Sequence, residues 1–146
     1  MKKFFRTDND PATLLIRLMM GIVFTSEGVQ KFLFPDSRGA GRFEKIGLPA
    51  PEFLGSFVGF FEVLCGLLIL AGLATRAAAG ILMIIMLMAL ITTKLPILMN
   101  EGIWKMLHDS RTDMSMLLAA IFLMIKGGGR WSADRNMGFN VRAGIT

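Results

Sequence analysis

The sequence feature that most constrains the fold is an apolar stretch over residues 12–34 that contains three charged side chains. A transmembrane helix needs roughly 20 mostly apolar residues, and this stretch meets that length. Arg17, Glu27 and Lys31 interrupt it, and on the insertion scale each such charge at mid-membrane costs about 2.5–3.5 kcal/mol. We therefore predict a membrane helix that packs against other helices whose polar groups balance its charges.

Three further apolar stretches follow, at residues 53–73, 77–95 and 111–126. Hydrophobic residues make up 53% of the chain and charged residues 18%, a balance typical of a membrane protein rather than of a soluble domain. The pattern predicts an all-α integral membrane bundle of four transmembrane helices, the first over residues 12–34. An even number of spans places both termini on the same side of the membrane.

The membrane bundle is expected to form one domain over residues 12–131. A polar N-terminal lead over residues 1–11 precedes it, and a loose polar tail over residues 132–146 follows. Eight Lys or Arg residues fall on the side of the termini and seven on the other side, so the positive-inside rule favours cytoplasmic termini by a small margin. We expect the partner to be the lipid bilayer and not a nucleic acid, because this sequence does not show a soluble fold with a stripe of basic residues that could bind one.

Ionisable side chains recur near one end of the four predicted helices. Glu27 and Lys31 share a face of the first helix at i,i+4 spacing, and Glu62 lies at a similar depth on the second helix. Asp113 begins the fourth helix at the same end. Charges inside a membrane pair with one another or line a pathway or cavity. The pattern predicts a polar pocket in the outer half of the bundle, for a ligand or for protons, or else a purely structural charge cluster.

Other side chains are weaker candidates for this pocket. Arg17 lies about one turn from the inner end of the first helix, from where its long side chain can reach toward the other charges. The secondary candidates are Thr92, Thr93, Lys94, His108 and Cys65. A single histidine and a single cysteine give no haem or metal signature and exclude an intrachain disulfide. Packing for the cysteine and an interfacial position for the histidine are the plainer explanations.

At these residues the chain resembles the DoxX family of small bacterial membrane proteins. The resemblance is carried, in chain order, by the run Leu15–Lys31 with Arg17, Gly21 and Gly28, by Gly47–Pro51, by Glu62 with Gly66, by Gly72–Arg76, and by Gly127–Asp134. These pieces together cover roughly residues 14–134. One position departs from the pattern, since many relatives have His before the first-helix glycine where this chain has Glu27.

The resemblance implies a four-helix protein of the bacterial inner (plasma) membrane with a redox-associated role. Members of the family include a membrane subunit of a thiosulfate:quinone oxidoreductase, and others are linked to thiol and oxidative-stress systems. We therefore expect a quinone- or sulfur-linked membrane subunit that acts with other redox-complex subunits. The cofactor stays open: the resemblance is compatible with a quinone, and the sequence shows no haem, flavin or metal signature.

Two other functions stay open at this point. The first is a non-enzymatic scaffold or chaperone-like partner whose charge cluster is structural. The second, less favoured, is a small transporter, because four short helices enclose a narrow pathway at best. The glycine-rich helix faces are compatible with a homo-oligomer.

Overall fold

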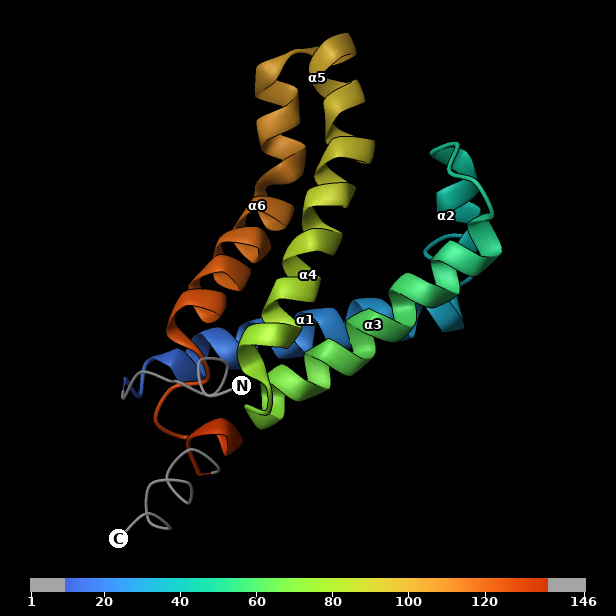
Figure 1. Ribbon diagram of the computed structural model, residues 1–146. Helices are drawn as coiled ribbons and strands as arrows, with labels where there is room; N and C mark the ends of the chain where they lie inside the picture. Colours follow the sequence, from blue (N-terminus) through green and yellow to red (C-terminus); the bar gives the residue numbers. More distant parts are fainter. Residues whose placement is uncertain (1–9, 137–146) are drawn as a thin grey trace, which may run out of the picture.

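The computed structural model describes residues 10–136 of the chain, and these are mostly α-helical (Figure 1). The helical elements are α1 (Thr13–Leu33), α2 (Ala40–Lys45), α3 (Pro51–Ala71), α4 (Thr75–Ala89), the π-helical segment η1 (Leu90–Lys94), α5 (Leu95–Glu101) and α6 (Ile103–Lys126). The elements α4, η1 and α5 follow one another directly and form one long helical segment. The predicted all-α class is confirmed.

Two helix pairs make up the fold. α1 packs along α3, and α4 packs along α6. Figure 1 shows that the two pairs meet at one corner, where α1 begins, α3 turns into α4 and α6 ends, and that they diverge from there. α2 lies at the far end of the first pair and α5 at the far end of the second.

Glycines allow α1 and α3 to approach closely. A Cβ atom on Gly28 would lie 2.6 Å from the carbonyl oxygen of Gly59. A Cβ atom on Gly66 would lie 3.1 Å from the carbonyl oxygen of Gly21. Small residues at such positions let two helix backbones pack without side chains between them.

The core lies where the two helix pairs meet. It combines residues of all four long helices: Met20, Phe24, Cys65, Ile69, Ala78, Ala79, Leu82, Met116, Ala119, Ala120 and Leu123. Large apolar side chains elsewhere on the same helices point outward and are exposed. A helix that is apolar on its outer face as well as its inner face is typical of a protein surrounded by lipid.

Two helical segments of the described chain are long and apolar enough to cross a membrane, Pro51–Ala71 and Thr75–Glu101. Their mean hydropathies are 2.2 and 2.3. α1 and α6 are not among these segments, so membrane crossing by these two helices remains a prediction.

The helix bounds differ from the sequence expectation in the second half of the chain. The third helix continues past residue 95 and ends at Glu101. Pro96 does not stop it, because Pro96 stands at the start of α5, next to the π-helical segment, where its missing N–H is tolerated. α6 begins at Ile103, well before the predicted residue 111, directly after the break at Gly102, whose φ is 87°.

The described part of the C-terminal tail also differs from expectation. Most of the predicted lead (residues 1–11) and most of the predicted tail (residues 132–146) lie outside the described residues. Ser132 and Asp134, however, are buried, and residues 133–136 are helical. The tail is therefore not loose at its start, because it folds back onto the corner where the helix pairs meet.

Candidate functional site

A buried ion pair joins α1 to α3. The Lys31 ammonium lies 2.5 Å from Glu62 Oε2, and their side chains are 10% and 4% exposed. The close approach of the two helices at Gly28 and Gly59 places these residues opposite each other. A buried charge needs a partner in this way, since an unpaired charge in a low-dielectric interior is strongly disfavoured.

Glu27 lies one helical turn before Lys31 but does not share the Lys31–Glu62 contact. Its carboxylate is 3.9 Å from the guanidinium of Arg38, and both side chains are substantially exposed. Glu27 thus stands between the buried pair and the charged surface of the segment before α2. This arrangement offers an ionisable group close to the buried pair and accessible from outside the helix pair.

A second ion pair joins η1 to α6. Lys94 Nζ lies 3.2 Å from Asp113 Oδ2 and also donates a hydrogen bond to the carbonyl oxygen of Asp109 at 2.9 Å. The Lys94 side chain is largely buried and that of Asp113 is partly exposed.

The predicted site residues therefore form two separate pairs and not one cluster. Lys31 and Glu62 belong to the α1–α3 pair, whereas Lys94 and Asp113 belong to the arm that contains η1 and α6. The two arms diverge away from their common corner (Figure 1). The prediction of a single pocket assumed that residues at the same depth on different helices lie close together. Because the two arms diverge, residues at similar depths on different arms lie apart.

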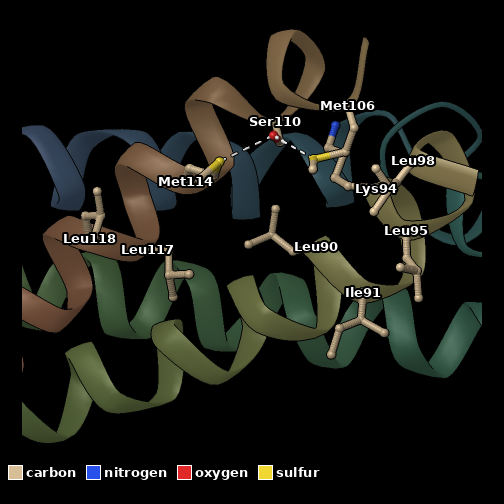
Figure 2. A pocket seen from close by; sticks show the side chains of 10 residues that line it. All are labelled: Leu90, Ile91, Lys94, Leu95, Leu98, Met106, Ser110, Met114, Leu117 and Leu118. Carbon is tan, nitrogen blue, oxygen red and sulfur yellow. Dashed lines mark hydrogen bonds between the residues drawn. The ribbon is translucent and has the colours of Figure 1, made fainter. Parts of the chain in front are cut away.

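A cavity of about 350 Å³ lies between the η1–α5 segment and α6 (Figure 2). Its lining is apolar except for Lys94 and Ser110. The ten lining residues are Leu90, Ile91, Lys94, Leu95, Leu98, Met106, Ser110, Met114, Leu117 and Leu118. The buried Ser110 hydroxyl lies 3.5 Å from each of three acceptors, the sulfurs of Met106 and Met114 and the carbonyl oxygen of Leu107. Figure 2 shows Ser110 between these two methionines, across from Leu90.

The π-helical segment forms one wall of this cavity. π-Helical turns within α-helices occur frequently at functional sites, and η1 contributes Leu90, Ile91 and Lys94 to the lining. The hydroxyls of Thr92 and Thr93 instead donate hydrogen bonds to carbonyls of the preceding turn, at 2.8 and 2.6 Å. The hydroxyls of these two threonines therefore bond to the backbone of their own helical segment, and neither residue lines the cavity.

Arg17 lies at the corner where the helix pairs meet, apart from the predicted pocket. It is 2% exposed, and its guanidinium donates hydrogen bonds to four backbone carbonyl oxygens, those of Ile69, Leu70, Gly128 and Trp131, at 2.6–3.1 Å. The carbonyls come from the end of α3 and from the segment after α6. Arg17 thus ties three parts of the chain together and does not reach Glu62.

Asp134 is a site residue that the sequence reasoning missed. Its carboxylate accepts hydrogen bonds from the backbone N–H groups of Ala74 and Thr75, at 2.6 and 2.9 Å. Ala74 carries no capping side chain of its own, so the tail supplies the N-terminal cap of α4. The signals that could have revealed this role were the uncapped start of α4 and the Ser-Ala-Asp sequence within the family-like ending.

The remaining predicted candidates do not join either ion pair. Cys65 is fully buried in the core, and His108 is exposed, with its ring nitrogens 3.4 Å from Arg111 Nη1. Within residues 10–136, no three His, Cys, Asp or Glu side chains gather where they could hold a metal ion.

These features define a class of protein: a small helical membrane protein with a buried ion pair between α1 and α3, a partly buried ion pair between η1 and α6, and an apolar cavity. The model of the DoxX family matches residues 12–95, so the chain belongs to the DoxX family. An uncharacterized membrane protein of Mycobacterium tuberculosis, Rv3486, is 48% identical over 141 residues, which cover 92% of this chain and 86% of that protein.

A more distant relative carries a functional name. The putative oxidoreductase CatD of Bacillus subtilis is 30% identical over 115 residues, covering 79% of this chain and 78% of that protein. No solved structure matches the chain significantly. The predicted family is confirmed, and with its apolar helices the chain is a membrane protein.

Proposed function

We propose that the chain is a multi-pass protein of the bacterial plasma membrane whose four spans are α1, α3, the segment from α4 to α5, and α6, with both termini in the cytoplasm. The contacts of the charged residues support spanning by the two less apolar helices. On α1, Arg17 binds carbonyls and Lys31 binds Glu62. On α6, Asp113 binds Lys94. Paired charges of this kind are tolerated within a membrane.

Within this topology, the protein serves as a redox-associated subunit that binds a quinone. The observation that carries this proposal is the apolar cavity between η1–α5 and α6. Its volume falls at the lower end of the range of about 300–1,000 Å³ usual for ligand sites, which are apolar with a few polar groups. A quinone ring suits such a lining, and the Ser110 hydroxyl or the Lys94 ammonium could donate to one of its carbonyl oxygens.

The ionisable pairs supply the protons that quinone chemistry needs. Reduction of a quinone to a quinol consumes two electrons and two protons. We assign the electrons to a redox group on a partner subunit and both protons to water at the membrane surface, from which the Lys94–Asp113 pair would pass them one at a time to a quinone in the cavity that Lys94 lines. Glu62 and Lys31, with Glu27 toward the surface, form a second candidate proton path on the α1–α3 arm. The name of the Bacillus relative, a putative oxidoreductase, agrees with a redox role.

The proposal is tested by adding a quinone to the purified protein. We expect menadione and decylubiquinone to raise the thermal unfolding temperature in detergent. Leu117→Trp fills the cavity and should abolish this shift, whereas Leu67→Trp, on an exposed position of α3, should retain it. No shift with the unaltered protein, and no quinone in lipid extracts of it, would refute the quinone site. A shift that survives Leu117→Trp would move the site elsewhere.

A second function is favoured by one specific observation. The most deeply buried charges, Arg17, Glu62 and Asp134, are all satisfied by hydrogen bonds, as expected for a scaffold whose charges only fix the order of helices. Under that alternative, Glu62→Gln lowers stability but leaves partner capture intact. Under the redox proposal, the same variant also slows quinol formation by the isolated complex.

A further inference from the structure

We infer that the corner where the two helix pairs meet binds the headgroups of anionic phospholipids through a basic collar. The collar is defined by four side chains: Arg76, Lys126, Arg130 and Arg135. It lies at the end of the molecule away from η1 and α5, so this inference does not depend on the quinone proposal.

Contacts of the backbone bring these four residues to one place. Arg76, at the start of α4, donates to the carbonyl oxygen of Ile125 at 2.7 Å, beside Lys126 at the end of α6. Arg135 Nη1 donates to the carbonyl oxygen of Arg130 at 3.3 Å. The Arg130 N–H in turn lies 3.4 Å from the carbonyl oxygen of Asp10, which precedes α1. These contacts place the collar residues at the corner where α1 begins and α6 ends, a corner that Figure 1 shows in the ribbon.

Among the described residues, basic side chains outnumber acidic ones at this corner. Residues 10–20, 69–80 and 122–136 build it, and their acidic residues are Asp10 and Asp134. Asp134 is buried, and its carboxylate is occupied by the N–H groups that begin α4. Arg17 adds a fifth cation beneath the collar, and its hydrogen bonds go to carbonyl oxygens. The excess of positive charge is complementary to phosphate groups.

The far ends of the two arms lack such an excess. Between residues 34 and 52, Arg38, Arg42 and Lys45 are matched by three acidic residues. Between residues 94 and 113, three cations are likewise matched by three acidic residues. The described chain thus concentrates its unbalanced positive charge at one end only.

Apolar side chains at the collar identify a lipid leaflet, and not a dissolved phosphate, as the partner. Trp131 is 61% exposed next to Arg130, and Ile125 is similarly exposed next to Lys126. An exposed indole beside basic residues suits the boundary between headgroups and acyl chains. Anionic headgroups attract basic residues at the membrane surface, so the collar and Trp131 would engage two layers of the same leaflet.

The two tryptophans allow a direct test in the full-length protein. Trp104→Phe leaves Trp131 as the fluorophore at the collar, and Trp131→Phe leaves Trp104 at the opposite end as a control. In nanodiscs of fixed phosphatidylcholine and phosphatidylglycerol content, we expect brominated phosphatidylglycerol to quench Trp131 at least twofold more than brominated phosphatidylcholine. Trp104 should be quenched equally by both lipids. Equal quenching of Trp131 by both lipids overturns the inference.

Charge variants in the Trp104→Phe protein distinguish the collar from general attraction by a basic protein. Arg76→Gln with Arg130→Gln should remove the preference for the anionic lipid. Arg38→Gln with Lys45→Gln removes the same charge at the far end and should leave the preference unchanged. If both double variants lose it equally, net charge and not the collar explains it. If inorganic phosphate at millimolar concentration abolishes the preference at constant ionic strength, the corner binds free phosphate and the lipid assignment is wrong.

Discussion

The Asp134 carboxylate accepts a hydrogen bond from the backbone N–H of Thr75 at 2.9 Å, although 59 positions separate the two residues in the sequence. A second bond, from the N–H of Ala74, completes the cap of α4. The short helical segment at residues 133–136, which follows α6, thus stabilises the turn between α3 and α4.

Replacement of Asp134 should destabilise the protein through this cap. Asp134→Ala leaves the buried N–H of Thr75 and the partly buried N–H of Ala74 without this partner, and we expect a loss of about 1–3 kcal/mol in the free energy of unfolding. Denaturant-induced unfolding in detergent, followed by circular dichroism, measures the loss. Glu101→Ala, an exposed acidic residue at the end of α5, is the control and should change stability by less than about 0.5 kcal/mol. Equal losses for the two variants would contradict the capping role.

Arg17 should not tolerate replacement by lysine. The guanidinium directs several N–H groups in a fixed plane toward four carbonyls, whereas a lysine ammonium has three donors on a flexible stem. We expect Arg17→Lys to lower the free energy of unfolding by about 2–4 kcal/mol, because buried carbonyls lose their donors. The same experiment on Arg38→Lys, which alters an exposed arginine, should show almost no change. A tolerant Arg17→Lys would mean that the charge alone matters at this position.

The glycine contact between α1 and α3 gives a matched pair of variants. A Cβ on Gly28 would lie 2.6 Å from the carbonyl oxygen of Gly59, whereas a Cβ on Gly80 of α4 would meet only the Met124 sulfur at 4.0 Å. Gly28→Ala should therefore force the helices apart and lower the unfolding temperature. Gly80→Ala should be neutral, or stabilising by up to about 1 kcal/mol through helix propensity. The order of the two unfolding temperatures checks the packing of this helix pair.

Much of the fold follows from local sequence signals. The apolar stretch at residues 12–34 and the one at residues 53–73 match α1 and α3 within two residues at each end, because their apolar lengths and prolines are local signals. The bounds near Pro96 were predicted less well, since a π-helical turn depends on packing against α6. The break at Gly102 and the early start of α6 in a polar segment were missed for the same reason.

The site was harder to predict than the helices. The spacing of Lys31 and Glu62 gave their common depth correctly, but depth along separate helices does not specify the angle between helix pairs. The prediction from the sequence therefore placed Asp113 and Glu62 in one pocket. In the structure they belong to different ion pairs on divergent arms. The role of Asp134 depends on a contact across 59 positions; the uncapped start of α4 and the Ser-Ala-Asp sequence are signals of such a role, but neither specifies the other as its partner.

The Lys31–Glu62 pair provides a last prediction, which separates structural from functional use of the buried charges. Either single variant, Lys31→Met or Glu62→Met, leaves one buried charge unpaired and should cost about 3–5 kcal/mol in the free energy of unfolding. The double variant removes both charges, and we expect it to recover most of that loss, because apolar residues of similar size often replace a buried ion pair without penalty.

Activity of the double variant then decides whether the Lys31–Glu62 pair is a proton path or only a structural contact. If the pair carries protons, a stable double variant should still bind quinone in the cavity beside η1 but should lose quinol formation with its redox partner. If the pair only orders the helices, the double variant should retain both binding and turnover. Because stability is restored in the same protein, a loss of turnover could not be attributed to unfolding, and the Lys31–Glu62 pair would be identified as a functional group.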